Sequence, residues 1–139
     1  MAALFLTCKE LWNGDVRKEV VYLSLKDDND VAMRFYRDDV FRIYVYSRVQ
    51  NPSRQISISL NLSNCFGVTD VSALGKVHTL YLSRCSRVTD VSALGKVHTL
   101  DLYRCSGIIN VRGQAQSALK NVHTLYLFSY DNYNSTTSW

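Results

Sequence analysis

Leucines separated by one residue recur along the second half of the chain, with a period of 20 residues over the first three copies. Residues two positions apart lie on one side of a β-strand, so each pair predicts a short strand with both leucines facing a core. After each pair the apolar positions fall at every third residue, which favours a tight coil or a 3₁₀ arc over a long α-helix. The leucine pairs are Leu60/Leu62, Leu80/Leu82, Leu100/Leu102 and Leu125/Leu127.

Thirteen residues are repeated without change, since residues 68–80 and 88–100 both read VTDVSALGKVHTL. Such self-similarity is typical of repeat proteins, in which each small unit stacks on the next. One unit, here called a rung, cannot bury its apolar edge alone, so neighbouring rungs are obligatory. We expect parallel strands about 4.8 Å apart on one side of a short stack. We also expect Gly75 and Gly95 to allow the bend toward the next strand.

Residues 1–55 do not follow this repeat, and their apolar residues have a helical spacing. We therefore expect a helical cap that covers the apolar end of the first rung, as repeat proteins require. The helices are expected at about 3–12, 15–25, 29–37 and 38–48.

Pro52, the only proline, marks the boundary between this segment and the repeats. The chain accordingly divides into a helical cap at 1–55, repeats at 56–128 and a polar tail at 129–139. Either the aromatic residues of the tail fold over the last rung, or that edge of the sheet stays open to association.

The complete repeat reads LxLxxCxxVTDVSALGKVHTL, with cysteine at the position that asparagine usually holds in leucine-rich repeats. It resembles the cysteine-containing repeats that often follow F-box motifs, and its TDVSxL segment is similar to internalin-type repeats. The whole string most resembles repeat arrays encoded by giant DNA viruses. The resemblance implies an α/β solenoid, a short leucine-rich-repeat array with parallel concave strands and an N-terminal helical cap. It also implies a non-catalytic protein–protein interaction module.

Residues 15–42 look somewhat like an F-box, which has an apolar helix, a polar turn with an acidic residue, and a helix entering a basic-aromatic stretch. The segment lacks the Leu-Pro start of that family. As an alternative to a plain cap, the resemblance implies a substrate adaptor for ubiquitination, with the substrate held by the repeats. The residues that would contact the F-box-binding adaptor of a ubiquitin ligase are Val20, Val21, Leu23, Leu25 and Val31.

The residues that flank the leucines point to the other side of each strand, where repeat proteins usually bind. The central strand position varies from Asn to Tyr to Asp to Tyr, whereas the arc of the second rung copies that of the first. Tyrosines around a carboxylate offer stiff contact area with a polar handle, although aromatic residues also shield a short, wet sheet. The predicted partner-binding residues are Asn61, Thr79, Tyr81, Thr99, Asp101, Tyr103, Tyr126 and Phe128.

Three cysteines occupy one slot of successive rungs, which predicts a ladder of buried thiols that bond weakly to the turn backbone. No close CxxC pair of the zinc-binding kind occurs, so we expect no metal and no cofactor. Asp70 and Asp90 are expected to accept hydrogen bonds from the following turn. The histidines also share a slot, and we expect a column of copied rim residues rather than a metal site or a pH sensor. The columns are Cys65, Cys85, Cys105 and His78, His98, His123.

The remaining chemistry is sparse. No phosphate loop and no nucleophile beside a base occur, so we expect no enzyme. No apolar run approaches the ~20 residues that span a bilayer, and the N-terminus lacks the basic start of a signal peptide. These features favour a cytoplasmic protein, in the host cytoplasm if it is viral. Nucleic-acid binding is the weaker alternative, through a basic edge near the strand exits formed by Arg84, Arg87, Arg104 and Arg112.

Overall fold

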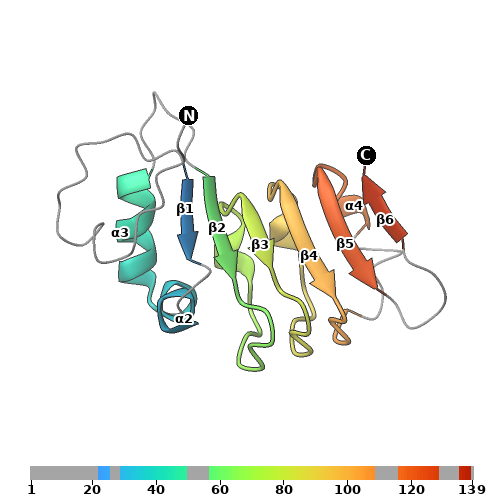
Figure 1. The fold of residues 1–139 in the computed structure, drawn as a ribbon, viewed down its shortest axis with the longest axis horizontal. Coiled ribbons are helices and arrows are strands. Elements are labelled where there is room, and N and C mark those ends of the chain that lie inside the picture. The colour runs from blue at the N-terminus through green and yellow to red at the C-terminus, as the bar shows by residue number, and fades with distance from the viewer. Residues whose placement is uncertain (1–21, 26–28, 50–56, 109–115, 129–134, 139) are drawn as a thin grey trace. The chain divides into compact units, whose positions relative to one another are not determined.

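The computed structural model describes residues 22–25, 29–49, 57–108, 116–128 and 135–138 (Figure 1). The chain forms two compact units, Met1–Leu60 and Asn61–Trp139. The expected helix at 3–12, the boundary at Pro52 and the adaptor-binding candidates Val20 and Val21 lie outside the described residues. None of the helices within the described ranges has the length and apolar character needed to cross a membrane.

The first unit combines two helices with a pair of strands. Helices α2 (Asn29–Arg37) and α3 (Asp39–Val49) lie where the spacing predicts them. The expected helix over 15–25 is wrong for its last residues, because Tyr22–Leu25 form strand β1, parallel to β2 (Ser57–Asn61). The segment Leu23-Ser24-Leu25 has the same leucine spacing as the repeat strands. In an apolar run this short, the periodicity does not show whether the residues form a helix or a strand.

Polar side chains fix the junction between α2 and α3. The carboxylate of Asp38 accepts a hydrogen bond from the backbone N–H of Phe41 at 2.9 Å, as an N-cap does, and this bond lowers the pKa of Asp38. The buried guanidinium of Arg42 donates to the carbonyls of Phe35 and Tyr36 at the end of α2, at 3.1 and 2.9 Å. These bonds satisfy helix ends that would otherwise lack partners.

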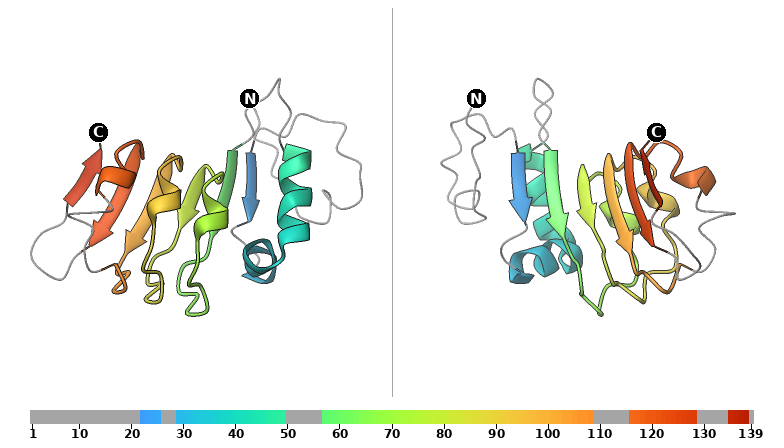
Figure 2. Two further views of the ribbon diagram at one scale, coloured as in Figure 1. Left: turned by 180° about the vertical axis from the view of Figure 1, so that it is seen from behind. Right: turned by 45° about the vertical axis from the view of Figure 1, so that its right-hand side comes forward.

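The second unit is built from strands that follow one another at a fixed offset. Strands β3 (Thr79–Tyr81), β4 (Thr99–Tyr103) and β5 (Thr124–Phe128) are parallel, with Thr79 opposite Thr99 and Thr99 opposite Thr124. Figures 1 and 2 show these strands side by side, with short arcs behind them. The structure therefore has the α/β character and the parallel sheet that the repeat pattern predicts.

The arcs between the strands are tight coils. Short 3₁₀ helices, η1 (Ser72–Leu74) and η2 (Ser92–Leu94), lie at the same position of two rungs. Backbone hydrogen bonds between residues three apart continue on either side, as in Val68 N–H to Cys65 O at 3.1 Å and Val77 N–H to Leu74 O at 3.0 Å. This geometry confirms the arc predicted from the three-residue apolar spacing. In the third rung a single helical turn, α4 (Gln116–Ala118), takes this place.

The interior of the second unit is a continuous column of leucine and valine. In the second rung the two strand leucines, the thiol and every third residue of the arc are buried. Burial of a Val or Leu side chain stabilises a fold by about 1.5–3 kcal/mol, so this column is the main source of cohesion. Its members in this rung are Leu80, Leu82, Cys85, Val88, Val91, Leu94 and Val97.

The end of the chain is paired with the last repeat strand. Residues Ser135–Ser138 form β6, which runs antiparallel to β5, with Leu125 opposite Thr137. The polar tail therefore contributes a strand that covers the edge of β5. Threonine is β-branched and suits a strand. The edge of β5 is therefore not left open, and the aromatic residues of the tail lie outside the described residues.

Gly75 and Gly95 are required by close approach rather than by an unusual bend. Both have ordinary right-handed helical backbone angles, with φ of −63°. A Cβ atom at Gly75 would clash with the carbonyl oxygen of Ala93, and one at Gly95 would clash with that of Ala118. Each glycine therefore lets its arc pack directly on the backbone of the next rung, which corrects the role expected from the sequence.

We predict that Gly95→Ala lowers the free energy of unfolding by about 1–3 kcal/mol, since the added methyl group overpacks against rigid backbone. Urea unfolding followed by circular dichroism measures this change. The matched control is Lys96→Ala at the next, exposed position, which should alter stability by less than about 0.5 kcal/mol. Equal stability of the two variants would contradict the packing argument.

Candidate partner-binding surface

The outward face of the repeat strands carries the variable residues in register. Tyr81 lies opposite Asp101, and Asp101 lies opposite Tyr126, so these side chains follow one another across adjacent rungs. In the next row Tyr103 lies opposite Phe128. This register is the arrangement expected for side chains that alternate with buried leucines.

The exposure of the predicted partner-binding residues differs. Tyr126 has 42% of its surface exposed, the most of the large apolar side chains on this face. Asn61, Tyr81, Thr99, Asp101 and Tyr103 are half-buried. Thr79 is only 9% exposed, so it offers little surface to a partner. Phe128 lies in β5, and its side chain is not among those described.

The carboxylate of Asp101 is bound within the fold. Its Oδ1 accepts a hydrogen bond from the backbone N–H of Tyr103 at 2.9 Å, and its Oδ2 accepts one from the hydroxyl of Ser83 on the preceding rung. Asn61 makes the equivalent local bond, from Ser63 N–H to Asn61 Oδ1 at 3.0 Å. Asp101 thus stabilises its turn and connects two rungs. The carboxylate that was predicted to bind a partner already accepts hydrogen bonds within the chain.

The turn after each strand has a left-handed residue in the same slot. Asn64, Arg84 and Arg104 have φ of 62°, 62° and 56°. Asparagine tolerates this region, whereas for most other non-glycine residues it costs about 1–2 kcal/mol. The guanidinium of Arg104 lies 5.2 Å from the ring centre of Tyr103, within cation–π range. The strained turns therefore place exposed arginines beside the outward face.

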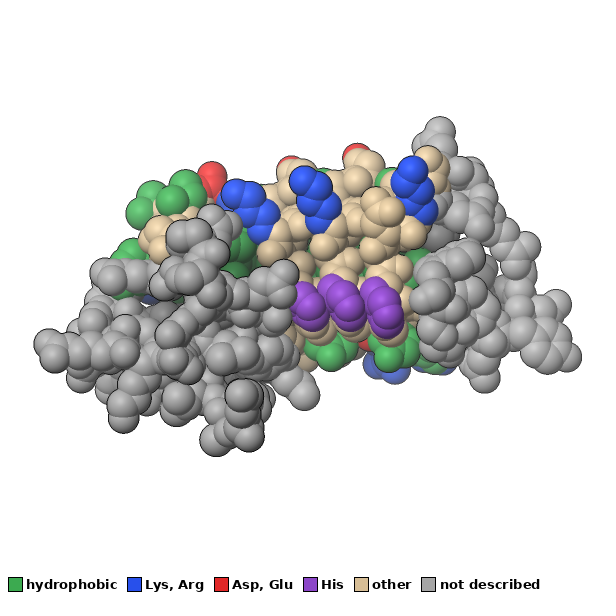
Figure 3. Space-filling model, turned by 90° about the horizontal axis from the view of Figure 1, so that it is seen from above, with side chains coloured by type: hydrophobic (Ala, Val, Ile, Leu, Met, Phe, Trp, Pro, Cys, Tyr) green, Lys and Arg blue, Asp and Glu red, His purple; other side chains and the backbone are tan. Residues whose placement is uncertain are grey.

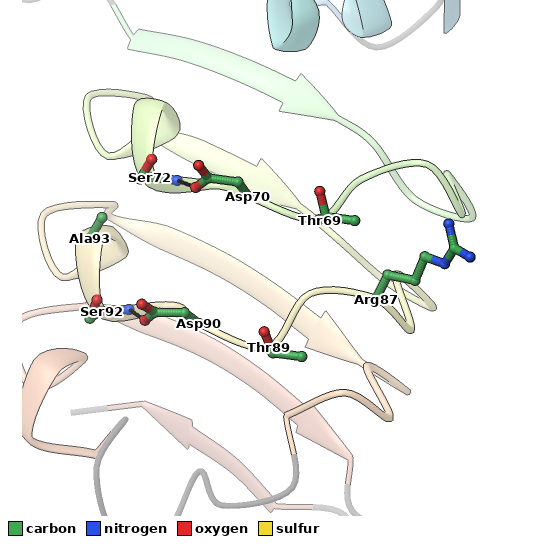
Figure 4. Close-up of a pocket in the computed structure, with 8 residues that line it drawn as sticks. All are labelled: Thr69, Asp70, Ser72, Arg87, Thr89, Asp90, Ser92 and Ala93. Atoms are coloured by element: carbon green, nitrogen blue, oxygen red, sulfur yellow. Dashed lines mark hydrogen bonds between the residues drawn. The ribbon is translucent and has the colours of Figure 1, made fainter.

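The predicted basic edge is only partly assembled. Arg84 and Arg104 lie in equivalent turns of adjacent rungs and are both exposed. Arg87 instead lines an open groove of about 400 Å³ between two arcs, together with Thr69 and Thr89 (Figure 4). Arg112 lies outside the described residues. Two aligned arginines are few compared with the 6–10 phosphate contacts typical of strong nucleic-acid binding.

The carboxylates of the arc groove serve the turns that follow them. Asp70 accepts the backbone N–H of Ser72 at 2.9 Å, and Asp90 accepts that of Ser92 at 2.8 Å. These bonds lower the pKa of both carboxyl groups. The predicted role of the two aspartates is confirmed, and Figure 4 shows the two copies lying parallel along the groove.

The cysteines form the predicted ladder. The thiol of Cys85 donates to the carbonyl of Leu62 at 3.1 Å, and the thiol of Cys105 donates to that of Leu82 at 2.9 Å. Burial raises the pKa of Cys85 to about 12 and that of Cys105 to about 11. The thiols link successive rungs, and both stay protonated near neutral pH.

The histidines also form the predicted column. Ring centres of His78 and His98 are 4.6 Å apart with an interplanar angle of 10°, and those of His98 and His123 are 4.6 Å apart at 12°. In each case Nδ1 lies 3.1–3.2 Å from the hydroxyl of the following threonine. Burial, and then the neighbouring His98, lower the pKa of His78. Among the described residues no cluster of three metal-ligating side chains occurs.

The F-box-like anchors do not share one helix. Leu23 and Leu25 lie in β1, where they pair with Ile58 and Leu60 of β2, whereas Val31 lies half-buried in α2. The F-box pattern begins with an apolar helix, so the position of Leu23 and Leu25 in a strand departs from it, and the adaptor-binding role of these residues stays a prediction.

We predict that Cys65 reacts much faster with a disulfide reagent at pH 8 than Cys85 or Cys105. Cys65 is half-buried, whereas the other two are buried. The thiolate is the reacting form, and a pKa of about 12 leaves about one part in ten thousand of Cys85 ionised at that pH. Variants that keep one of the three cysteines, with Cys8 replaced by Ser, separate the rates. Denaturant should equalise them, and equal rates in the native protein would contradict the ladder.

We predict that Arg84→Asn raises the free energy of unfolding by about 0.5–1 kcal/mol, because asparagine tolerates the left-handed conformation better than arginine. Asn64 already occupies the equivalent slot. Arg87→Asn is the control, since Arg87 is exposed and is not among the described residues with positive φ. A gain for Arg87→Asn as large as that for Arg84→Asn would point to net charge as the cause.

Together the outward face offers aromatic area, satisfied polar groups and flanking arginines, a composition suited to contact with a macromolecule. The groups that carry chemistry recur because the repeat is copied, and they do not converge on one reacting point. Comparisons with protein-family models, curated proteins and solved structures found no match.

Proposed function

We propose that this chain is a leucine-rich-repeat solenoid that acts as a non-catalytic protein–protein interaction module. Its partner binds the outward face of the strands, the concave side of such a solenoid. The fixed strand register, the 3₁₀ arcs and the thiol ladder support the repeat assignment. These three features explain the structural role of nearly every residue that the repeat copies. The residues that differ between rungs are left for recognition of a partner.

One observation carries the proposal. Tyr81 and Tyr126 flank Asp101 in register on the outward face, at a strand position that the repeat does not copy. The leucines of the core beneath, Leu80, Leu82 and Leu100, are fully buried. Aromatic side chains held on rigid strands lose little entropy on binding and are enriched at interface hot spots.

Substitution of the two tyrosines tests partner binding better than substitution of Asp101. Truncation of a hot-spot tyrosine commonly costs about 2 kcal/mol or more, roughly thirtyfold in affinity. Asp101 is bound to Ser83 and Tyr103, so its removal would loosen the rungs as well as change the surface. Variants at Asp101 therefore do not report on binding alone.

We predict that the double variant Tyr81→Ala/Tyr126→Ala loses a specific partner that the wild-type protein retains in an affinity pull-down. The control variant Arg87→Ala alters an exposed residue of the arc groove and should retain the partner. Circular dichroism verifies that both variants are folded. If the tyrosine variant keeps every partner of the wild type at equal yield, the outward face is not the binding surface.

A further inference from the structure

The edge at which the repeat strands begin carries two rows of cationic or protonatable side chains. Three exposed lysines precede the histidines by two or three residues. Figure 3 shows the three histidines as one continuous row, and a second row of Lys and Arg side chains runs along the same face across a band of other residues. We call this surface the strand-start edge, and it consists of Lys76, Lys96, Lys120, His78, His98 and His123.

Each rung carries one exposed lysine shortly before its histidine. Lys96 and His98 are exposed, and Val97 between them is fully buried. In the third rung Lys120 precedes His123 by three residues, and Asn121 takes the position that Lys96 holds in the second. The lysines therefore recur once per rung, although the third copy is shifted by one residue.

We propose that the strand-start edge binds an acidic segment of a partner protein and takes up protons as it does so. The imidazoles stand 4.6 Å apart, close to the 5–6 Å between carboxylate-bearing residues on one face of a helix. Nδ1 of each ring is bonded to a threonine hydroxyl. Nε2 is therefore the nitrogen that meets the ligand, and a protonated ring donates from it to a carboxylate.

Nucleic acid fits this edge less well. Both faces of the His98 ring are covered by neighbouring imidazoles, so that ring offers no platform on which a base could stack. Three lysines are also few compared with the 6–10 phosphate contacts of a typical nucleic-acid site. A short acidic peptide needs only a few charge-assisted hydrogen bonds.

The charges around the histidines set the direction of the pH effect. Among the described residues the adjoining arcs carry the three lysines and Arg87, and on the strands Asp101 is held by Ser83 and Tyr103. Asp70 and Asp90 are held by their own turns. Burial and the neighbouring His98 lower the pKa of His78, and a carboxylate bound at its ring would raise that pKa again. The bound form therefore holds more protons than the free form, so affinity rises as the pH falls from 8 to 6.

We predict that fluorescein-labelled hexaglutamate binds the full chain about fivefold more tightly at pH 6 than at pH 8, as expected over this range for one linked proton whose pKa rises by one unit. Fluorescence anisotropy at low salt measures the affinity, and hexaglutamine is the uncharged control. His98→Gln/His123→Gln should reduce the pH dependence, because His78 is then the one histidine left at this edge. Lys96→Gln/Lys120→Gln should weaken binding at both pH values and keep the ratio between them.

Other results overturn the proposal. Binding that does not change with pH excludes the histidines, and stronger binding of a six-nucleotide oligothymidylate assigns the edge to nucleic acid. The proposal does not depend on the tyrosine face, so Tyr81→Ala/Tyr126→Ala should bind hexaglutamate as the wild type does. Loss in that variant would place the acidic ligand on the outward face instead. NMR titration of the histidines in the wild-type protein needs no variant, and an unchanged pKa on adding peptide also excludes proton uptake.

Discussion

Stacking at a fixed register is the constraint on which the second unit depends. The carbonyl of Leu62 accepts both the backbone N–H of Cys65 in its own turn and the thiol of Cys85 in the next rung, each at 3.1 Å. A slip of one residue would turn the leucines toward solvent and break both bonds. Gly75 and Gly95 add a steric limit in the first two arcs, because only a residue without Cβ allows the next backbone so close. The register is thus fixed at the strand, the turn and the arc.

The same stacking explains why like groups gather in columns. A residue copied once per rung must lie about one strand spacing from its copy, whatever its charge. Thiols tolerate this because burial keeps them neutral, and the pKa of Cys85 at about 12 reflects that state. Imidazoles tolerate it while unprotonated, with their faces in contact. Lysines keep their charge and lie exposed, where water screens their repulsion.

Much of the second unit was predictable from sequence, because residues that recur every 20 positions must occupy equivalent places in successive rungs. The strand leucines, the three-residue arcs, the thiol ladder and the histidine column all follow from residues that return every 20 positions. The first unit has no such period, and Leu23-Ser24-Leu25 was assigned to a helix although it pairs with β2. Its parallel partner lies more than 30 residues further along the chain, and local spacing carries no information on such a pairing.

The site was less predictable than the fold, since contacts between rungs decide which surface residues are available. Asp101 reads as a binding carboxylate in the sequence, but Ser83 of the preceding rung engages it. Thr79 differs from Thr99 in burial although their sequence surroundings are alike. The sequence shows two of the lysines in the repeated GKVH. Only the structure shows that the neighbouring histidines stack into one surface.

Copying and variation have therefore shaped two different surfaces of one scaffold. At the strand-start edge the histidine is copied in three rungs, so the imidazoles are repeated at a spacing that the backbone imposes. On the outward face they differ, as the change from Tyr81 to Asp101 to Tyr126 shows. Repetition suits a ligand that is itself periodic, such as a run of carboxylates. Variation suits a ligand with one shape, so under the proposed function the tyrosines that interrupt the pattern are the residues expected to distinguish one folded partner from another.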